Sequence, residues 1–235
     1  MPTSVPRSPA RWQAPRCALV LYTGDAGNDD VSAKLDSFAD TAGHTVTAIR
    51  VDPLVDKSRG MCSNPFFRGL VALLERGFVA GIFAAPPCAT VSARRSCASG
   101  GDFGYTPRVL RHRLDVLAPL PGLTRKETTE VLVASHFFVA ALYLCGLAAW
   151  RGLWHLVENP TDPEAPHPSF WVSFRCLSAD FHPGSRVLVT MQCPYGCPVA
   201  KPTGLWTACR PSRHRSDCQA LQTRTVLSHF YARDV

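Results

Sequence analysis

One short stretch of the chain presents a cysteine in a setting suited to covalent chemistry. The segment AAPPCATVSARR at 84–95 follows an apolar run, and its two consecutive prolines hold Cys88 in a stiff, extended loop. Arg94 and Arg95 follow closely, and their positive charges favour the thiolate form of a nearby cysteine. Cys88 is therefore a candidate nucleophile. The alternative is a small, buried apolar side chain, which is the usual role of a free cysteine.

Two acidic residues come at the ends of other apolar stretches. Glu158 lies near the end of LWHLVENP at 153–160, where a carboxylate can hold or transfer a proton. It could instead be a strand-end carboxylate paired with an arginine. Asp52 ends the alternating stretch TVTAIRVD at 45–52, a position from which a carboxylate can bind ribose hydroxyls. Its alternative is a cap or turn residue before Pro53.

An α/β sheet is the arrangement that would position these side chains. Apolar and alternating runs predict strands at 17–22, 45–52, 79–84 and 153–160, and two antiparallel strands at 186–192 and 204–208. Helical patterns lie between them, at 28–42, 64–76, from about Thr124 onward, and at 169–177. Ligands of parallel α/β sheets collect beyond the carboxyl ends of the strands, where we expect Gly24, Asp52, Cys88 and Glu158.

The order of these motifs resembles that of the cytosine carbon-5 DNA methyltransferases. A turn with Tyr22-Thr23-Gly24 comes first, then the loop Pro86-Pro87-Cys88, then the dipeptide Glu158-Asn159. The segments PPCATVSARR, ENP, PSFW and QCPYGCPVAKPTGLWT are similar to a short, divergent subgroup from phages, mobile elements and protists. The resemblance covers about residues 17–231. It implies a Rossmann-like sheet of the class I S-adenosylmethionine-dependent methyltransferases, with a small C-terminal antiparallel extension.

The resemblance also implies roles for individual residues. Cys88 would add to carbon 6 of a cytosine, and Glu158 would contact the ring nitrogen and the exocyclic amine, so that carbon 5 accepts a methyl group from S-adenosylmethionine. The base would have to leave the helical stack or be single-stranded. The residues that would contact the cofactor are Tyr22, Thr23, Gly24, Asp52 and Pro86. The residues that would contact nucleic acid are Arg94 and Arg95.

Two features of the family are absent, and they keep a second hypothesis open. The Gln-x-Arg-x-Arg strand has no counterpart beyond Arg186 or Gln192, and the chain has no room for a large target-recognition domain. A methylase-like module that binds nucleic acid or cofactor without turnover is therefore the alternative. An amino-methyltransferase ranks third, because the loop lacks an Asp/Asn-Pro-Pro-aromatic pattern. A zinc site is the weaker interpretation of Cys193, Cys197, Cys209, His214 and Cys218, so we expect no metal.

Length and composition set the remaining expectations. The 235 residues carry a net charge of +7, and seven of the basic residues lie between Arg94 and Lys126, which suits a polyanion, with DNA favoured over RNA. The ten cysteines in a chain without an apolar signal core predict an intracellular protein, in nucleus or cytoplasm. We expect a disordered leader at 1–15, one domain at 16–235 and a monomer. The uncharged stretch Val131 to Trp150 is expected to be a buried core helix rather than a membrane span.

Overall fold

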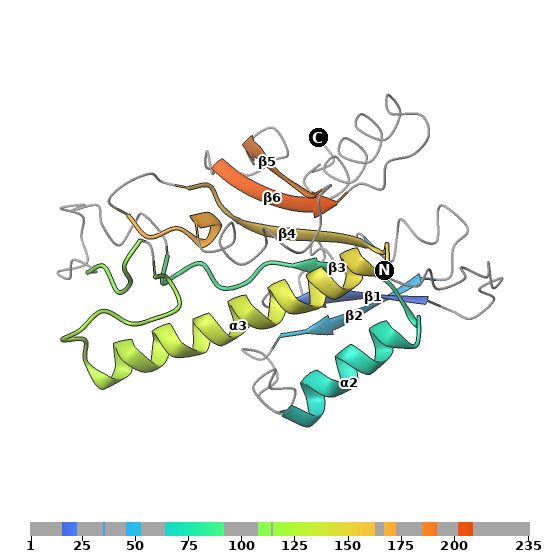
Figure 1. Cartoon of the computed structure of the whole chain (residues 1–235), viewed down its shortest axis with the longest axis horizontal. Helices are drawn as coiled ribbons and strands as arrows, with labels where there is room; N and C mark the ends of the chain where they lie inside the picture. Colours follow the sequence, from blue (N-terminus) through green and yellow to red (C-terminus); the bar gives the residue numbers. More distant parts are fainter. Residues whose placement is uncertain are drawn as a thin grey trace, which may run out of the picture.

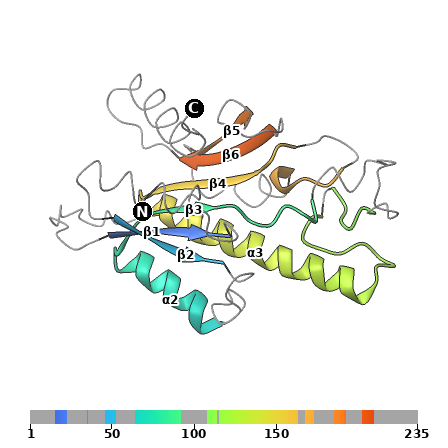
Figure 2. The same cartoon turned by 180° about the vertical axis from the view of Figure 1, so that it is seen from behind.

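A six-stranded mixed sheet forms the framework of the protein (Figures 1 and 2). The computed structural model describes residues 16–22, 35, 46–52, 64–91, 108–113, 115–162, 167–172, 185–191 and 202–208. Its strands are β1 (Arg16–Leu21), β2 (Val46–Val51), β3 (Val79–Ala84), β4 (Trp154–Pro160), β5 (Ser185–Met191) and β6 (Pro202–Ala208).

The strand order in the sheet is β2-β1-β3-β4-β6-β5. Strands β2, β1, β3 and β4 are parallel, whereas β6 pairs antiparallel with both β4 and β5. This confirms the predicted α/β sheet with a C-terminal antiparallel extension. Each predicted strand is present, with ends shifted by no more than two residues.

Two helices are described, α2 (Asn64–Glu75) and α3 (Arg125–Trp150). The predicted start of α3 is confirmed, because the Thr124 side chain accepts a hydrogen bond from the Glu127 amide while the Glu127 carboxylate accepts one from the Thr124 amide. Gly77, with a φ of 79°, ends the turn after α2 in the left-handed conformation that favours glycine. The predicted helix at 169–177 is seen only over 170–172, and its part beyond 172 lies outside the described residues.

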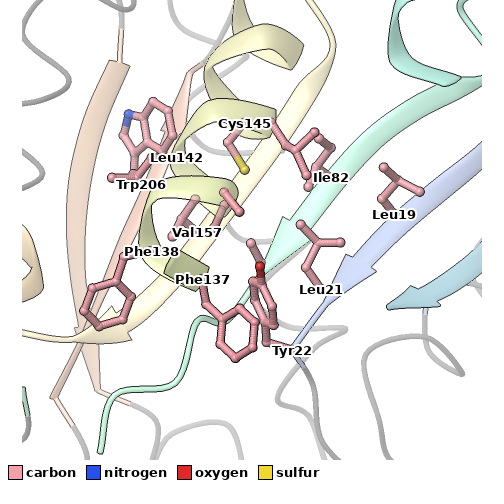
Figure 3. Close-up of a cluster of buried hydrophobic side chains, with 14 of the residues drawn as sticks. Leu19, Leu21, Tyr22, Ile82, Phe137, Phe138, Leu142, Cys145, Val157 and Trp206 are labelled. Carbon is pink, nitrogen blue, oxygen red and sulfur yellow. The ribbon is translucent and has the colours of Figure 1, made fainter. Parts of the chain in front are cut away.

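The main core lies between the sheet and α3 (Figure 3). Side chains of β1, β3 and β4 that point to this face meet one side of the helix. Labelled members of this cluster include Leu19, Leu21, Ile82, Phe137, Phe138, Leu142, Cys145 and Val157. This cluster contains many more buried apolar residues than the cluster on the opposite face.

A smaller cluster covers the opposite face of the sheet. Val20, Phe83, Leu156 and Leu205 form it, and the helical residue Leu35 packs against it. Leu35 is the one described residue of the helix predicted at 28–42. Parallel strands with apolar residues toward both faces are typical of an α/β sheet covered on two sides.

Helix α3 is the one helix among the described residues that is long and apolar enough to cross a membrane. Of its most apolar 18-residue window, 67% is buried within the protein. Core helices pass the same test of length and composition, so the helix is weak evidence for a membrane. The sheet-facing residues of α3 belong to the main core.

Candidate functional site

The carboxyl ends of the four parallel strands meet at one edge of the sheet. Leu21 at the end of β1 lies opposite both Val51 and Ala84. The pairing continues past the strand ends, because the Tyr22 amide donates to the Val51 carbonyl at 3.0 Å and the Ala85 amide donates to the Leu21 carbonyl at 3.0 Å. The segments that follow the strands are therefore neighbours in space.

This edge brings together the described members of the predicted site. Following the order of the strands, Asp52 comes after β2, Tyr22 after β1 and Cys88 after β3, while Glu158 lies in β4. Adjacent strands are about 4.8 Å apart, so these positions span about 15 Å along the edge. Thr23 and Gly24 lie outside the described residues.

A buried hydrogen bond connects the Pro-Pro-Cys loop to the Glu-Asn dipeptide. The side-chain amide of Asn159 in β4 donates to the carbonyl of Pro86 at 3.0 Å, and Asn159 is only 1% exposed. Just beyond, the Val91 amide donates to the Cys88 carbonyl at 3.0 Å and closes a turn. The cysteine is thus held between two backbone anchors, as the rigid loop of the sequence predicts.

Cys88 differs from the other described thiols in its surroundings. It is half-buried and packs at the margin of the main core. Cys145 lies wholly inside that core, where burial raises the pKa of its thiol. Burial also raises the pKa of Cys17, on β1. Of the three described thiols, Cys88 is the one beside the strand-end motifs.

Glu158 lies on the strand face of the smaller cluster, whereas Cys88, in the loop after β3, packs against the main core. Side chains alternate along a strand, so Glu158 shares the face of Leu156, whereas Asn159 shares the face of Val157. Cys88 packs against the cluster that contains Val157, and Leu156 belongs to the opposite cluster.

The other end of the edge carries Tyr22 and Asp52, two of the residues predicted to contact a cofactor. Tyr22 has a φ of 64°, the one left-handed residue other than glycine in the described part of the chain. Its ring lies against Phe137 of α3, with centroids 5.0 Å apart (Figure 3), and this packing holds the strained turn in place. Asp52, 7% exposed, follows the neighbouring strand. A carboxylate at such a strand end can accept hydrogen bonds from a ribose.

Some side chains of the basic cluster, which is predicted to bind a polyanion, form hydrogen bonds and ion pairs with other groups of the protein. The guanidinium of Arg108 forms two hydrogen bonds with Glu127, at 2.9 and 2.5 Å. Arg113 donates to the Asp162 carboxylate at 2.9 Å and to the His167 carbonyl at 2.8 Å. Both side chains therefore pair with groups of the protein itself, which leaves fewer charges for a polyanion than the sequence indicates. Arg94 and Arg95 lie outside the described residues.

Arg111 is a third member of that cluster with an internal role. It is 1% exposed and donates to the Val131 carbonyl at 2.8 Å, to the Ser135 hydroxyl at 2.7 Å and to the Val116 carbonyl. Its guanidinium also lies 5.1 Å from the centre of the Phe138 ring. Burial lowers the pKa of Arg111 to about 10. Arg111 attaches the segment around 110–120 to α3.

Three residues that shape the site were not among the predicted site residues. Asn159 holds the cysteine loop, and the indole nitrogen of Trp171 donates to the Pro160 carbonyl at 2.6 Å. Gly204 in β6 leaves room for that indole, since a Cβ there would lie 2.6 Å from the Trp171 ring. Asn159 and Trp171 belong to short motifs that can be seen in the sequence. The sequence does not show which groups these two side chains bond.

Strand β5 carries Arg186, one of the two candidates for the family's arginine that contacts the base. This strand is separated from β4 by β6. Arg186 of β5 pairs with Thr207 of β6, which in turn pairs with Leu156 of β4. Arg186 is therefore two strands from Glu158 and at the level of a residue two positions before it. Gln192 lies outside the described residues, as do Cys193, Cys197, Cys209, His214 and Cys218.

Comparison with known proteins gives no assignment, because no family model and no curated protein matches this chain. Within the described ranges, no group of three or more His, Cys, Asp or Glu side chains could hold a metal ion.

Proposed function

We propose that this protein is a methyltransferase that moves a methyl group from S-adenosylmethionine to carbon 5 of cytosine in nucleic acid, with Cys88 as the nucleophile. The observation that carries the proposal is the hydrogen bond from Asn159 to the Pro86 carbonyl. It joins the two motifs that the reaction needs, on adjacent parallel strands. The sheet would then be of the Rossmann-like class I methyltransferase type.

In the proposed reaction, the Cys88 thiolate forms a bond to carbon 6 of the ring. Glu158 hydrogen-bonds the ring nitrogen and the exocyclic amine and supplies the proton that favours this attack. Carbon 5 becomes nucleophilic and forms a bond to the methyl group, whose bond to the sulfonium sulfur breaks, so that S-adenosylhomocysteine is the leaving group. Loss of the proton at carbon 5 to solvent and departure of Cys88 from carbon 6 then restore the aromatic ring and free the thiol.

Tyr22 and Asp52 support a cofactor site next to the cysteine loop. Asp52 would accept hydrogen bonds from the ribose hydroxyls, and the left-handed turn at Tyr22 lets the backbone approach the ligand closely. Thr23, Gly24 and Pro86 complete the proposed set. When bound, S-adenosylmethionine supplies an electrophilic methyl group.

The proposed attack on carbon 6 restricts the substrate. A cytosine inside a duplex is stacked and its carbon 6 cannot be reached by Cys88, so the base must be extruded or single-stranded. The net charge of +7 supports a polyanionic partner, and we propose DNA before RNA.

A binding module without turnover is the second candidate function. The position of Arg186 in β5, two strands away from β4, favours it, because Arg186 was one of the two candidates in the sequence for the residue that contacts the base.

Transfer of tritiated S-adenosylmethionine methyl groups to cytosine-containing DNA and RNA tests the proposal. We expect transfer by the wild type and by Cys17→Ser, a matched control with a half-buried thiol on β1, and none by Cys88→Ser. An oligonucleotide that contains 5-fluorocytosine should form a covalent adduct with Cys88. Transfer by Cys88→Ser would contradict the thiol mechanism, and cofactor binding without any transfer would favour the binding module.

A further inference from the structure

Several independent contacts fix the position of Trp171 at the carboxyl end of β4. The residue is 4% exposed, and its indole nitrogen donates to the Pro160 carbonyl at 2.6 Å. Its backbone amide donates to the Ser169 hydroxyl at 3.2 Å. The preceding ring, Phe170, packs against Phe138 of α3 with ring centroids 5.1 Å apart. Both the backbone and the ring of Trp171 are therefore held in place.

The sheet leaves room for this indole beside Asn159. Gly204 of β6 is the cross-strand partner of Asn159, so positions 159 and 204 present their side chains on the same face. A Cβ at Gly204 would lie 2.6 Å from atoms of the Trp171 ring, so the ring covers this position. The indole thus lies on the face from which the Asn159 amide extends to the Pro86 carbonyl.

Two hydrogen bonds connect Trp171 to the cysteine loop through adjacent residues of β4. The indole holds the carbonyl of Pro160, and the side chain of Asn159 holds the carbonyl of Pro86 at 3.0 Å. Asn159 is 1% exposed, so water competes little for the second bond. These contacts form a continuous connection from the indole to the loop that carries Cys88.

Prolines make this connection stiff. Pro160 has a fixed φ and restricts the backbone of Asn159 before it, so few torsions are free between the two hydrogen bonds. On the loop side, Pro87 restricts the backbone between Pro86 and Cys88 in the same way. A displacement of the indole should therefore move the cysteine loop, because little of it can be absorbed by rotation of the chain.

We propose that Trp171 is a positioning residue for Cys88. By holding the end of β4, the indole keeps the Asn159 amide directed at the Pro86 carbonyl, and so holds the loop in which the thiol lies. The Val91 amide, which donates to the Cys88 carbonyl at 3.0 Å, closes the turn on the other side of the thiol. Loss of the indole N–H lets this loop move and exposes the thiol.

Arg113 supports the segment that carries Trp171. Its guanidinium donates to the Asp162 carboxylate at 2.9 Å and to the His167 carbonyl at 2.8 Å. Asp162 follows β4, and His167 comes four residues before Trp171. The arginine therefore holds the Trp171 segment next to the strand end that the indole supports.

A purely structural role of the indole makes a different prediction. A buried indole nitrogen needs a hydrogen-bond acceptor, and the Pro160 carbonyl would then be only the nearest one. Removing the N–H would lower stability, as at another buried tryptophan, with no separate effect on Cys88. Trp206 of β6 (Figure 3) is the matched comparison, because it is 1% exposed and its ring lies 4.4 Å from that of His155, near the start of β4.

The rate at which iodoacetamide alkylates Cys88 in the native protein tests the proposal. Trp171→Phe removes the indole N–H and keeps an aromatic ring, and we expect it to make alkylation of Cys88 about fivefold faster. Trp206→Phe should leave this rate unchanged. Circular dichroism and urea denaturation check that both variants fold. Equal acceleration by the two variants, or none by Trp171→Phe, would overturn the proposal.

Gly204→Ala displaces the indole without changing it, and it replaces Trp171→Phe if that variant does not fold. The added methyl group overlaps the Trp171 ring, so this variant should also accelerate alkylation of Cys88. In the Trp171→Phe background the same substitution should add little, because the hydrogen bond that it disturbs is already absent. Additive effects of the two substitutions on the alkylation rate would overturn the proposal.

The effect of Trp171 on methyl transfer rests on the proposed function. In a wild type that transfers methyl groups, Trp171→Phe should lower kcat about fivefold with little change in KM for S-adenosylmethionine, because Tyr22 and Asp52 lie at the other end of the edge. A higher KM with unchanged kcat would contradict the positioning role. A wild type without transfer would contradict the proposed function, and the alkylation rates would still decide the role of Trp171.

Discussion

Asn159 and Pro86 are 73 residues apart in the sequence, yet the side-chain amide of one donates a 3.0 Å hydrogen bond to the carbonyl of the other. The bond runs between the segment that carries Glu158 and the loop that carries Cys88. It lies in the protein interior, where water does not compete for the donor or the acceptor. The bond therefore adds to the pairing of β3 with β4 in fixing the segments of the two candidate catalytic groups side by side.

Replacing Asn159 with alanine should loosen the cysteine loop. The Pro86 carbonyl would remain buried without its donor, which costs about 1–3 kcal/mol of unfolding free energy. We expect alkylation of Cys88 to become several-fold faster and methyl transfer to fall at least tenfold. Urea denaturation, iodoacetamide kinetics and the tritium assay measure the three effects.

Ser135→Ala is the matched control for this change. Ser135 is also buried and donates to the Leu117 carbonyl at 2.8 Å, so its loss should destabilise the fold by a similar amount. It lies on α3 and makes no contact with the loop at 86–91 among its hydrogen bonds in the structure. Equal acceleration of Cys88 alkylation by both variants would contradict the role assigned to Asn159.

The three described thiols should react in a definite order in the native protein. Cys145 is 0% exposed and burial raises the pKa of its thiol, so it should stay unmodified until the protein unfolds. Cys17, whose pKa burial also raises, should react slowly. We expect Cys88 to be alkylated first, as followed by peptide mass spectrometry over time. Protection of Cys88 equal to that of Cys145 would contradict its role as a nucleophile.

Two glycine-to-alanine substitutions should change stability in opposite directions. At Gly204 the new methyl group would lie 2.6 Å from the Trp171 ring, and relieving this overlap should cost about 1–3 kcal/mol. At Gly69 in α2 a Cβ meets nothing within 4 Å, so the better helix propensity of alanine should add about 0.5–1 kcal/mol. Thermal or urea denaturation measures both. A neutral Gly204→Ala would show that the indole does not occupy this position.

The start of α3 should make stability depend on pH in the acidic range. Hydrogen bonds from Arg108, and then from Thr124, lower the pKa of Glu127 from 4.5 to about 2. The folded state therefore favours the carboxylate, and its contribution is complete above pH 4.5 and is lost as the pH falls toward about 2.

Denaturation of the wild type and of Glu127→Gln from pH 7 to pH 3 measures this contribution. We expect the wild type to be more stable at pH 7 and the difference to shrink below pH 4.5. Because the pair is at the surface, added salt should also reduce the difference. A difference that stays constant with pH would show that the charge of Glu127 is not what stabilises the helix start.

The local pattern of the sequence was enough to predict the framework of the site. Alternating and apolar runs located the strands, Thr124 marked the start of α3, and a glycine, an acid or a cysteine near the end of each parallel strand predicted a shared edge. These features depend on residues within one element, whose hydrophobic period and capping chemistry are readable from neighbours in the chain.

The tertiary structure alone decided how the groups at that edge relate to one another. That Asn159 bonds Pro86, and that Arg108, Arg111 and Arg113 pair with other groups of the protein, could not be read from spacing. Each depends on contacts between segments distant in sequence. Such contacts exist only once the sheet has aligned the strands, because a side chain's partner is set by which element lies beside it and not by its neighbours along the chain.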